Sequence, residues 1–348
     1  MGKNISINQN NFDFIRLVLA FTVMGHHTFD LIPGNLYSEI HPFFKDQIAI
    51  RAFFIISGFL IAKSLSNTSS LKKYFIKRIR RIVPAYTFVI LFFAIFLSFF
   101  STLSYSEYFS SDQFWSYLGF NLIYQNYLQP CLPGVFGAEN VNCAVNGALW
   151  TIKIEETFYL LLPLLVFIQS KMFQKKWMFY LLVYVTSILF FNVLMQFGLY
   201  RFAKQLPGSL CFFVGGILAY HYFDWLTSKM NYLIFPAILL FLLELNFTSF
   251  LVISPLALTI IILFVAYNFK FLNRFGRYGD FTYGTYIFHY PIIQLAVWAG
   301  LHNQIGKWQL FLLIICTTFV SAIFSWKFIE SRFISRNFIH RIQSLENK

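Results

Sequence analysis

Charged side chains are scarce in this chain of 348 residues. Asp, Glu, Lys and Arg make up 12% of the sequence, hydrophobic residues make up 58%, and the mean hydropathy is +0.62. Roughly a quarter of the residues in an ordinary globular protein are charged. So few polar residues cannot cover the surface of a soluble core of this size, which excludes a soluble enzyme, a disordered chain and a disulfide-stapled secreted module. What is left is a polytopic membrane protein.

Cysteine is also scarce, and its spacing lacks the common metal-binding motifs. The four cysteines form no CxxC pair or other metal-ligand spacing, so we predict no metal site. Cys211 and Cys316 lie in apolar runs, where we expect them to be packing residues. Cys131 and Cys143 lie in one polar segment, and a disulfide between them is possible if that segment faces an oxidising compartment.

Long apolar runs recur along the whole chain. A run of about 17–22 residues is long enough for a helix to span a bilayer. We place such runs at about 13–33, 43–64, 84–102, 149–168, 177–197, 206–223, 231–247, 250–268, 282–301 and 308–328. The sequence therefore predicts an all-α polytopic membrane protein of about ten transmembrane helices. We expect residues 1–348 to form a single domain with no appended soluble domain.

The formal net charge of +13 indicates the orientation of these helices. An even number of spans places both termini on one side. If that side is inside, five of the 27 Lys and Arg residues lie outside, two (Arg16 and Lys153) lie within spans, and the other 20 lie inside. The five outer residues are Lys45, Arg51, Arg201, Lys204 and Lys307. This excess predicts cytoplasmic termini, and it explains the positive charge without a nucleic-acid partner.

The longest connection, at about 103–148, then faces the extracytoplasmic side. Residues 112–127 resemble an amphipathic interfacial helix with Trp and Tyr side chains. Residues 129–146 contain Pro, Gly, Asn and both cysteines of the polar segment, so we expect them to be irregular.

Ionisable residues within spans are costly and are therefore candidates for function. Arg16 and His27 lie in the first span, separated by ten residues. That spacing is close to three helical turns, so both project from one face, roughly 16 Å apart along the axis. Arg16 is suited to bind an anionic phosphate, and His27 to act as a general base. The alternative is that Arg16 reaches the inner headgroups and that His27 bonds across helices. His26 points about 100° away and is the weaker candidate.

Two further groups of charged residues flank spans. Glu155 and Glu156 are adjacent, so at most one can point into a site, while the other is left to pair with Lys153 or to cap the start of the helix. On the inner side, Arg78 and Arg81 share one helix face and are suited to clamp nucleotide phosphates. A basic run of this kind is more often an anchor for anionic lipids.

The last group is a Tyr-rich segment, 283–291, that contains His289. His289 is a candidate proton relay, binding group or packing residue. Glu330, at the inner end of the last span, is positioned to pair with one of the inner arginines.

Five motifs in this order resemble the membrane-bound acyltransferase 3 family. They are Asp13-x2-Arg16-x10-His27, Phe53-Phe54-Ile55-Ile56-Ser57-Gly58-Phe59-Leu60, Arg78-x2-Arg81-Ile82-x-Pro84-Ala85, Trp150-x4-Glu155-Glu156-x-Phe158-Tyr159 and Tyr283-x2-Tyr286-x2-His289-x-Pro291. The resemblance covers about residues 12–333. Each motif alone is weak, but five in order on an inner-positive topology are specific.

The resemblance implies transfer of an acyl group, usually acetyl from cytoplasmic acetyl-CoA, to a hydroxyl of an extracytoplasmic or lipid-linked glycan such as lipopolysaccharide O-antigen or exopolysaccharide. It implies a multi-pass protein of the bacterial inner membrane, in contact with its lipids. His27 takes the position of the general base, supported by Glu155 or Glu156. Arg16, Arg78 and Arg81 take the positions expected to hold the CoA phosphates. Within the last two motifs we predict that Trp150, Tyr286 and His289 bind the acceptor.

The sequence departs from the family pattern at two places. Lys153 stands where members more often carry an uncharged residue, and the last motif ends Glu330-Ser331-Arg332 where many members have Glu-Lys-Pro. The main alternative function is a transporter or flippase of a glycan precursor without acyl chemistry. Such proteins usually contain inverted repeats and paired broken helices, and neither is evident here. A scaffold for polysaccharide assembly is a third possibility. The sequence specifies neither the sugar nor the oligomeric state.

Overall fold

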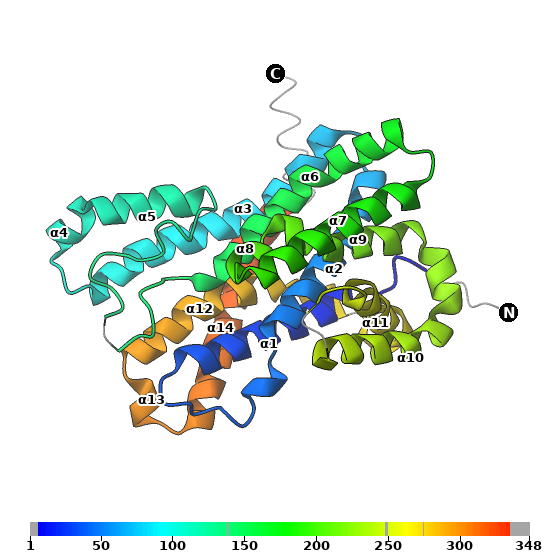
Figure 1. Ribbon diagram of the computed structural model, residues 1–348. Helices are drawn as coiled ribbons and strands as arrows, with labels where there is room; N and C mark the ends of the chain where they lie inside the picture. The colour runs from blue at the N-terminus through cyan, green and yellow to red at the C-terminus, as the bar shows by residue number, and fades with distance from the viewer. Residues whose placement is uncertain (1–5, 138, 248–249, 274, 335–348) are drawn as a thin grey trace, which may run out of the picture. The chain divides into compact units, whose positions relative to one another are not determined.

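The computed structural model describes residues 6–137, 139–247, 250–273 and 275–334. Helix makes up 78% of the structure. Among the described residues no strand forms, and one isolated antiparallel bridge joins Cys131 to Ala144. The all-α class predicted from the sequence is therefore confirmed (Figure 1).

The chain divides into two compact units, each built from three separate stretches. Unit 1 comprises residues 1–19, 47–74 and 154–278, and unit 2 comprises residues 20–46, 75–153 and 279–348. Helices α1 (Phe12–Leu31) and α3 (Leu71–Phe96) each contribute residues to both units. Each unit is described by itself below.

Unit 1 is a helical bundle whose helices meet at small residues. It contains most of α2 (Asp46–Ser66) and α6 (Trp150–Met172), together with α7 (Lys176–Gln196), α8 (Tyr200–Ala203), α9 (Leu206–His221), α10 (Phe223–Phe247) and α11 (Ser254–Asn268), and the 3-10 turns η4 (Lys270–Leu272) and η5 (Phe275–Tyr278). Helices α2 and α9 approach each other backbone to backbone. A Cβ on Gly58 would lie 2.1 Å from the Phe213 carbonyl oxygen, and one on Gly216 would lie 2.0 Å from that of Ile55. Only glycine permits this approach.

Unit 2 contains the rest of α1, most of α3, and the C-terminal helices. Its elements are η1 (His41–Phe43), η2 (Leu97–Phe100), α4 (Tyr105–Ser110), α5 (Asp112–Leu122), η3 (Gly147–Leu149), α12 (Thr282–Trp298), α13 (Leu301–Gln304), α14 (Lys307–Ser325), the π-helical turn η6 (Trp326–Glu330) and α15 (Ser331–Ile334). Helices α12 and α14 pack together, and a Cβ on Gly284 would lie 2.7 Å from the Cα of Ala322.

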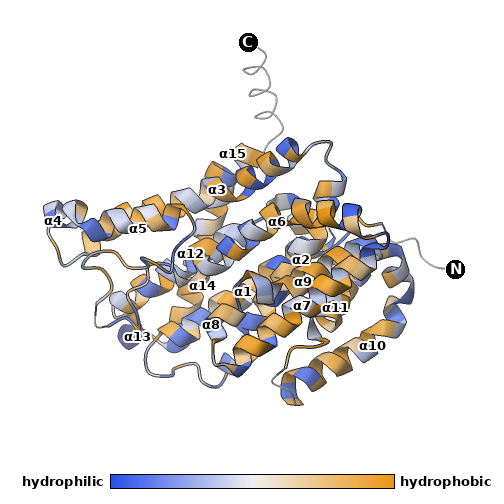
Figure 2. Ribbon diagram, turned by 45° about the horizontal axis from the view of Figure 1, so that its top comes forward, coloured by the Kyte–Doolittle hydropathy of each residue, from blue (hydrophilic) through white to orange (hydrophobic). Residues whose placement is uncertain are grey.

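Six segments are long and apolar enough to cross a membrane, judged by length and composition. They are His41–Ser66, Leu71–Phe100, Lys176–Gln196, Tyr200–His221, Phe223–Phe247 and Lys307–Ile334. Figure 2 shows hydrophobic residues, in orange, along much of the long helices. A helical membrane protein is thereby supported.

The ten predicted spans each fall on one helix, namely α1, α2, α3, α6, α7, α9, α10, α11, α12 and α14. Four of these helices are not among the six segments: α1 and α6, and α11 and α12, which have only 15 and 17 residues. Ten crossings and two cytoplasmic termini stay predictions.

The predicted interfacial helix over 112–127 is wrong at its C-terminal end. Helix α5 stops at Leu122, and Tyr124 adopts a left-handed conformation with φ of 63°. The Asn126 side-chain amide donates to the Tyr86 hydroxyl (2.9 Å) and to Asn121 Oδ1 (2.8 Å). These buried hydrogen bonds hold the chain in a turn after α5, because side-chain amides compete with the continuation of a helix.

A buried carboxylate that the sequence did not single out organises the start of α11. Glu244 on α10 accepts hydrogen bonds from the backbone N–H groups of Val252 (3.0 Å), Ile253 (2.6 Å) and Ser254 (3.0 Å). These donors have no partner within the helix, and an anion at this end is favoured by the helix dipole. Glu244 therefore fixes the connection from α10 into α11.

The glycine contact between α2 and α9 gives a test of the packing. Gly58→Ala should destabilise the protein by about 1–3 kcal/mol, because the new methyl group overlaps backbone that cannot move aside. Gly119→Ala in α5 is the control, since a Cβ there meets nothing within 4 Å. Thermal unfolding of both variants in detergent measures the difference. Equal melting temperatures for the two variants would contradict the contact.

Candidate active site

Two histidines from helices distant in the sequence meet inside unit 2. His27 of α1 and His289 of α12 lie with Nδ1 of the first 2.8 Å from Nε2 of the second. The ring planes differ by 8° and the ring centroids are 5.1 Å apart. Nδ1 of His289 lies 3.2 Å from the backbone carbonyl oxygen of Thr285, one helical turn earlier. His27 is half-buried, whereas His289 is completely buried.

The segment that follows the predicted interfacial helix is attached to α12 next to this pair. The Tyr290 ring stands edge-on to His27, with centroids 5.3 Å apart, and its hydroxyl donates to Asn142 Oδ1 (3.3 Å). The Gln294 amide donates to the carbonyl oxygens of Asn142 (2.9 Å) and Ala144 (2.8 Å). A disulfide joins Cys131 and Cys143, whose Cα atoms are 5.2 Å apart. The long connection is therefore held against the helix that carries His289.

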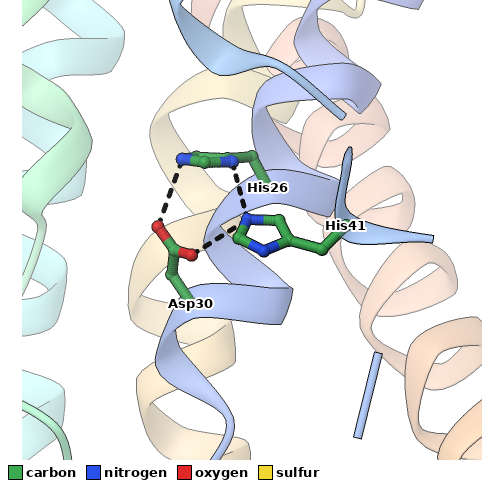
Figure 3. A group of neighbouring side chains, drawn as sticks. All are labelled: His26, Asp30 and His41. Carbon is green, nitrogen blue, oxygen red and sulfur yellow. Dashed lines mark hydrogen bonds and ion pairs between the residues drawn. The ribbon is translucent and has the colours of Figure 1, made fainter. Parts of the chain in front are cut away.

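His26, adjacent to His27, belongs to a second cluster (Figure 3). Its Nε2 lies 3.1 Å from Asp30 and 3.3 Å from Asp46, and its Nδ1 lies 3.2 Å from Nε2 of His41. His41 also contacts Asp30 at 3.0 Å. Among the described residues, His26, Asp30 and His41 are the group whose ligand atoms lie close enough together to hold a metal ion. Direct hydrogen bonds and ion pairs already join them, so we treat the group as a hydrogen-bonded cluster.

The predicted acidic pair lies on α6 within unit 1. Oε1 of Glu155 accepts hydrogen bonds from the Ser57 hydroxyl (2.7 Å) and from the Tyr159 hydroxyl. Ser57 belongs to the second of the five sequence motifs, so the structure brings two motifs together here. Glu155 and Glu156 belong to unit 1 and His27 to unit 2.

Arg81 forms part of an ion-pair network within unit 2. Its guanidinium binds the carboxylate of Asp280, lies 3.7 Å from that of Glu330, and lies over the Trp326 ring, 6.0 Å from the centroid. Glu330 is buried (1% exposed) and accepts from the Ser325 hydroxyl at 2.9 Å. The predicted pairing of Glu330 with an inner arginine is therefore confirmed. Two carboxylates therefore offset the positive charge of Arg81, which the sequence analysis predicted to bind a phosphate.

The remaining predicted residues are distributed over both units. Arg16 is half-buried on α1 in unit 1, and Arg78 is half-buried on α3 in unit 2. In unit 2 the Tyr286 hydroxyl hydrogen-bonds the Thr151 hydroxyl (2.6 Å) and donates to the Ala148 carbonyl oxygen (3.3 Å). Tyr286 thus connects α12 to the segment before α6. Trp150 begins α6 and is partly exposed.

Sequence reasoning missed two contacts of these residues. Asp280, the partner of Arg81, lies 199 residues further along the chain, and His289 lies 262 residues from His27. The one available signal was that His289 is an ionisable residue within a predicted span, which indicates a polar partner inside the protein.

The long apolar helices indicate a membrane protein, and two histidines meet inside its unit 2. The sequence model of a family described as an acyltransferase domain matches residues 9–328. The chain therefore belongs to the acyltransferase 3 family, and the resemblance seen in its motifs is confirmed.

Two of the similar proteins match this chain over nearly their whole length, and a third matches it over part of its length. The chain is 26% identical over 341 residues to the O-acetyl transferase of Shigella phage Sf6, covering 94% of this chain and 97% of that protein. It is 26% identical to nodulation protein 10 of Rhizobium leguminosarum bv. viciae, covering 94% of each. It is also 26% identical to the peptidoglycan O-acetyltransferase OatA of Listeria monocytogenes, covering 97% of this chain and 57% of that protein. No solved structure matches the chain.

The Arg81 network predicts a structural defect when its cation is removed. Arg81→Ala removes the guanidinium 3.7 Å from the buried Glu330 carboxylate, and breaking a buried pair in this way costs about 3–5 kcal/mol. We expect a large loss of folded protein, measured by size-exclusion chromatography in detergent. The double variant Arg81→Met with Glu330→Gln should recover part of it, because the fully buried side chain at position 330 then carries no charge. Normal folding of Arg81→Ala would show that the pair contributes little.

Proposed function

We propose that this protein transfers an acyl group, expected to be acetyl, from cytoplasmic acyl-CoA to a hydroxyl of an extracytoplasmic or lipid-linked glycan. Membership of an acyltransferase family supports the reaction type and favours it over transport without acyl chemistry. The names of two relatives, an O-acetyl transferase and a peptidoglycan O-acetyltransferase, support a hydroxyl acceptor on a glycan. The observation that carries the proposal is the half-buried His27, whose imidazole is hydrogen-bonded to that of the completely buried His289.

In the proposed reaction His27 acts as the general base. Its unprotonated ring nitrogen accepts the proton of the glycan hydroxyl while the hydroxyl oxygen attacks the thioester carbonyl carbon. The tetrahedral intermediate then collapses with cleavage of the carbon–sulfur bond. The departing thiolate takes the proton from His27, which leaves an O-acyl glycan, free CoA and neutral imidazole. The reaction needs no metal ion.

The acyl donor is expected to be held through its phosphates. Helix α1 runs without a break past both Arg16 and His27, so the two residues keep the helical separation of roughly 16 Å along its axis. The pantetheine arm of CoA has a comparable reach. Arg16 and Arg78 are the proposed phosphate-binding residues. Arg81, which two carboxylates neutralise, is better suited to fixing the position of α3 than to binding phosphate.

Other predicted residues take more limited roles in this proposal. The sequence assigned the orientation of His27 to Glu155 or Glu156, but Nδ1 of His27 contacts His289. A part for the two glutamates in binding or catalysis stays a prediction, as does acceptor binding by Trp150 and Tyr286. A multi-pass location in the bacterial inner membrane, with lipopolysaccharide O-antigen or exopolysaccharide as acceptor, belongs to the same proposal.

Removal of the base should abolish the reaction. His27→Ala is expected to lower transfer of radiolabelled acetyl from acetyl-CoA to membrane glycans by about 10²–10⁴-fold, the usual contribution of general-base catalysis. His302→Ala in α13 is the matched control and should transfer normally. Protein levels are compared by immunoblotting of the membranes. Near-wild-type transfer by His27→Ala would show that His27 is not the general base.

A phosphate-binding arginine should affect the donor and not the chemical step. Arg16→Ala is expected to raise the KM for acetyl-CoA about 10–100-fold, because one charge-assisted hydrogen bond contributes about 1.5–3 kcal/mol. The kcat should change little, since the interaction is made equally in the ground and transition states. Lys171→Ala at the end of α6 controls for the loss of a positive charge. A fall in kcat at unchanged KM would contradict this role for Arg16.

A further inference from the structure

We infer that His289 is a positioning residue that fixes which ring nitrogen of His27 carries a proton. The inference rests on the proposed function, in which His27 is the base. It assigns Nδ1 of His27 as the protonated nitrogen and Nε2 as the one that accepts the substrate proton. The order of hydrogen bonds leading from the Thr285 carbonyl to His27 supplies the argument.

The Thr285 carbonyl oxygen sets the direction of this chain of hydrogen bonds. A backbone carbonyl can only accept, so Nδ1 of His289, 3.2 Å away, must be the donor. A neutral imidazole carries one proton, so Nε2 of His289 then holds a lone pair. Nδ1 of His27, 2.8 Å from that lone pair, must in turn be protonated. Nε2 of His27 is left with a lone pair, which a general base needs.

The geometry of the two rings fits a directed hydrogen bond and not face-to-face stacking. The ring planes are nearly parallel, differing by 8°, and the centroid separation of 5.1 Å exceeds the N–N distance by about twice the radius of an imidazole ring. Rings stacked face to face have closer centroids, and their ring nitrogens do not point at one another. The two imidazoles therefore lie nearly in one plane, and the N–H of His27 points along the lone pair of His289.

Burial assigns different roles to the two histidines. His289 has no exposed surface and lies on α12, where Thr285 is equally buried. His27 is partly exposed. Of the two residues, His27 is therefore the one with surface open to a substrate, and His289 acts through its neighbour. The Tyr290 ring stands edge-on to His27 and restricts rotation of the imidazole about its side-chain bonds.

The arrangement resembles the orienting carboxylate of a catalytic triad in its effect on the base. In a triad, the carboxylate accepts a hydrogen bond from Nδ1–H of the catalytic histidine. The proton therefore stays on Nδ1, and Nε2 keeps its lone pair. Here a neutral imidazole, itself oriented by a backbone carbonyl, accepts the same hydrogen. A neutral acceptor gives less stabilisation to the imidazolium formed in the reaction, but it avoids placing an unpaired anion in the membrane interior.

The direct test is the tautomer of His27, measured by 15N NMR on the full-length protein. The protein is labelled at histidine, reconstituted in lipid nanodiscs, and compared with His27→Ala and His289→Gln to assign the two resonances. We expect His27 with a proton on Nδ1 and none on Nε2, and the same tautomer for His289. A proton on Nε2 of His27 in the neutral wild-type protein would overturn the inference, whatever the transfer activity.

A pair of variants separates positioning from packing. His289→Gln keeps an acceptor near the position of Nε2, whereas His289→Leu has a similar size and no acceptor. We expect His289→Leu to lower kcat by about 10²–10⁴-fold with KM for acetyl-CoA changed less than about threefold, and His27 to lose its tautomer preference. His289→Gln should keep the preference and most of the kcat. Equal kcat losses at equal thermal stability would overturn the inference.

These measurements distinguish the inference from the proposed function. If His27→Ala still transfers acetyl, the base assignment fails, while the tautomer in the wild-type protein still decides the role of His289. If transfer depends on His27 but His289→Leu is fully active, the proposed function stands and the positioning role is wrong.

Discussion

A hydrogen bond of 2.8 Å between two imidazoles joins α1 to α12 inside unit 2. Each ring nitrogen of a buried imidazole needs a hydrogen-bond partner, because its desolvation otherwise destabilises the folded protein. His289 meets this requirement with Thr285 on one side and His27 on the other. The second nitrogen of His27, a half-buried residue, is then the group that the proposal assigns to the chemistry. The proposed catalysis depends on this difference between the two nitrogens of His27: Nδ1 is hydrogen-bonded to His289, and Nε2 accepts the substrate proton.

The same constraint governs the other charged and polar side chains between the helices. Glu244 is surrounded by three backbone N–H groups, Glu155 by two hydroxyl groups, and Glu330 by a hydroxyl and a guanidinium. Each arrangement supplies the hydrogen bonds that water would otherwise provide. Charged residues make up only 12% of the chain, and each of these three glutamates has a specific set of hydrogen-bond donors. The low charge content thus concentrates the functional candidates in a few places.

Much of the fold could be predicted from the sequence, because apolar runs long enough to span a bilayer are a strong signal. Every predicted span falls on a helix, and the family resemblance of the motifs is confirmed. The ends of helices were less predictable: α5 stops early because of the amide of Asn126, a contact outside the local pattern. Of the candidate site, His27 and Arg16 were recognised by their helical spacing. Asp280 was not recognised, and His289 was named as a candidate but not as the partner of His27. The two residues lie 199 and 262 residues from Arg81 and His27, and local spacing contains no information on such pairs.

The most direct test of the central claim is acyl transfer by the purified protein in sealed proteoliposomes. Radiolabelled acetyl-CoA is supplied on one face of the membrane, and a bacterial surface glycan is supplied only on the other face. The account predicts that the glycan gains label as hydroxylamine-sensitive ester while free CoA appears in equal amount. Unchanged acetyl-CoA, with the glycan precursor moved across the membrane instead, would contradict the account and identify the protein as a transporter.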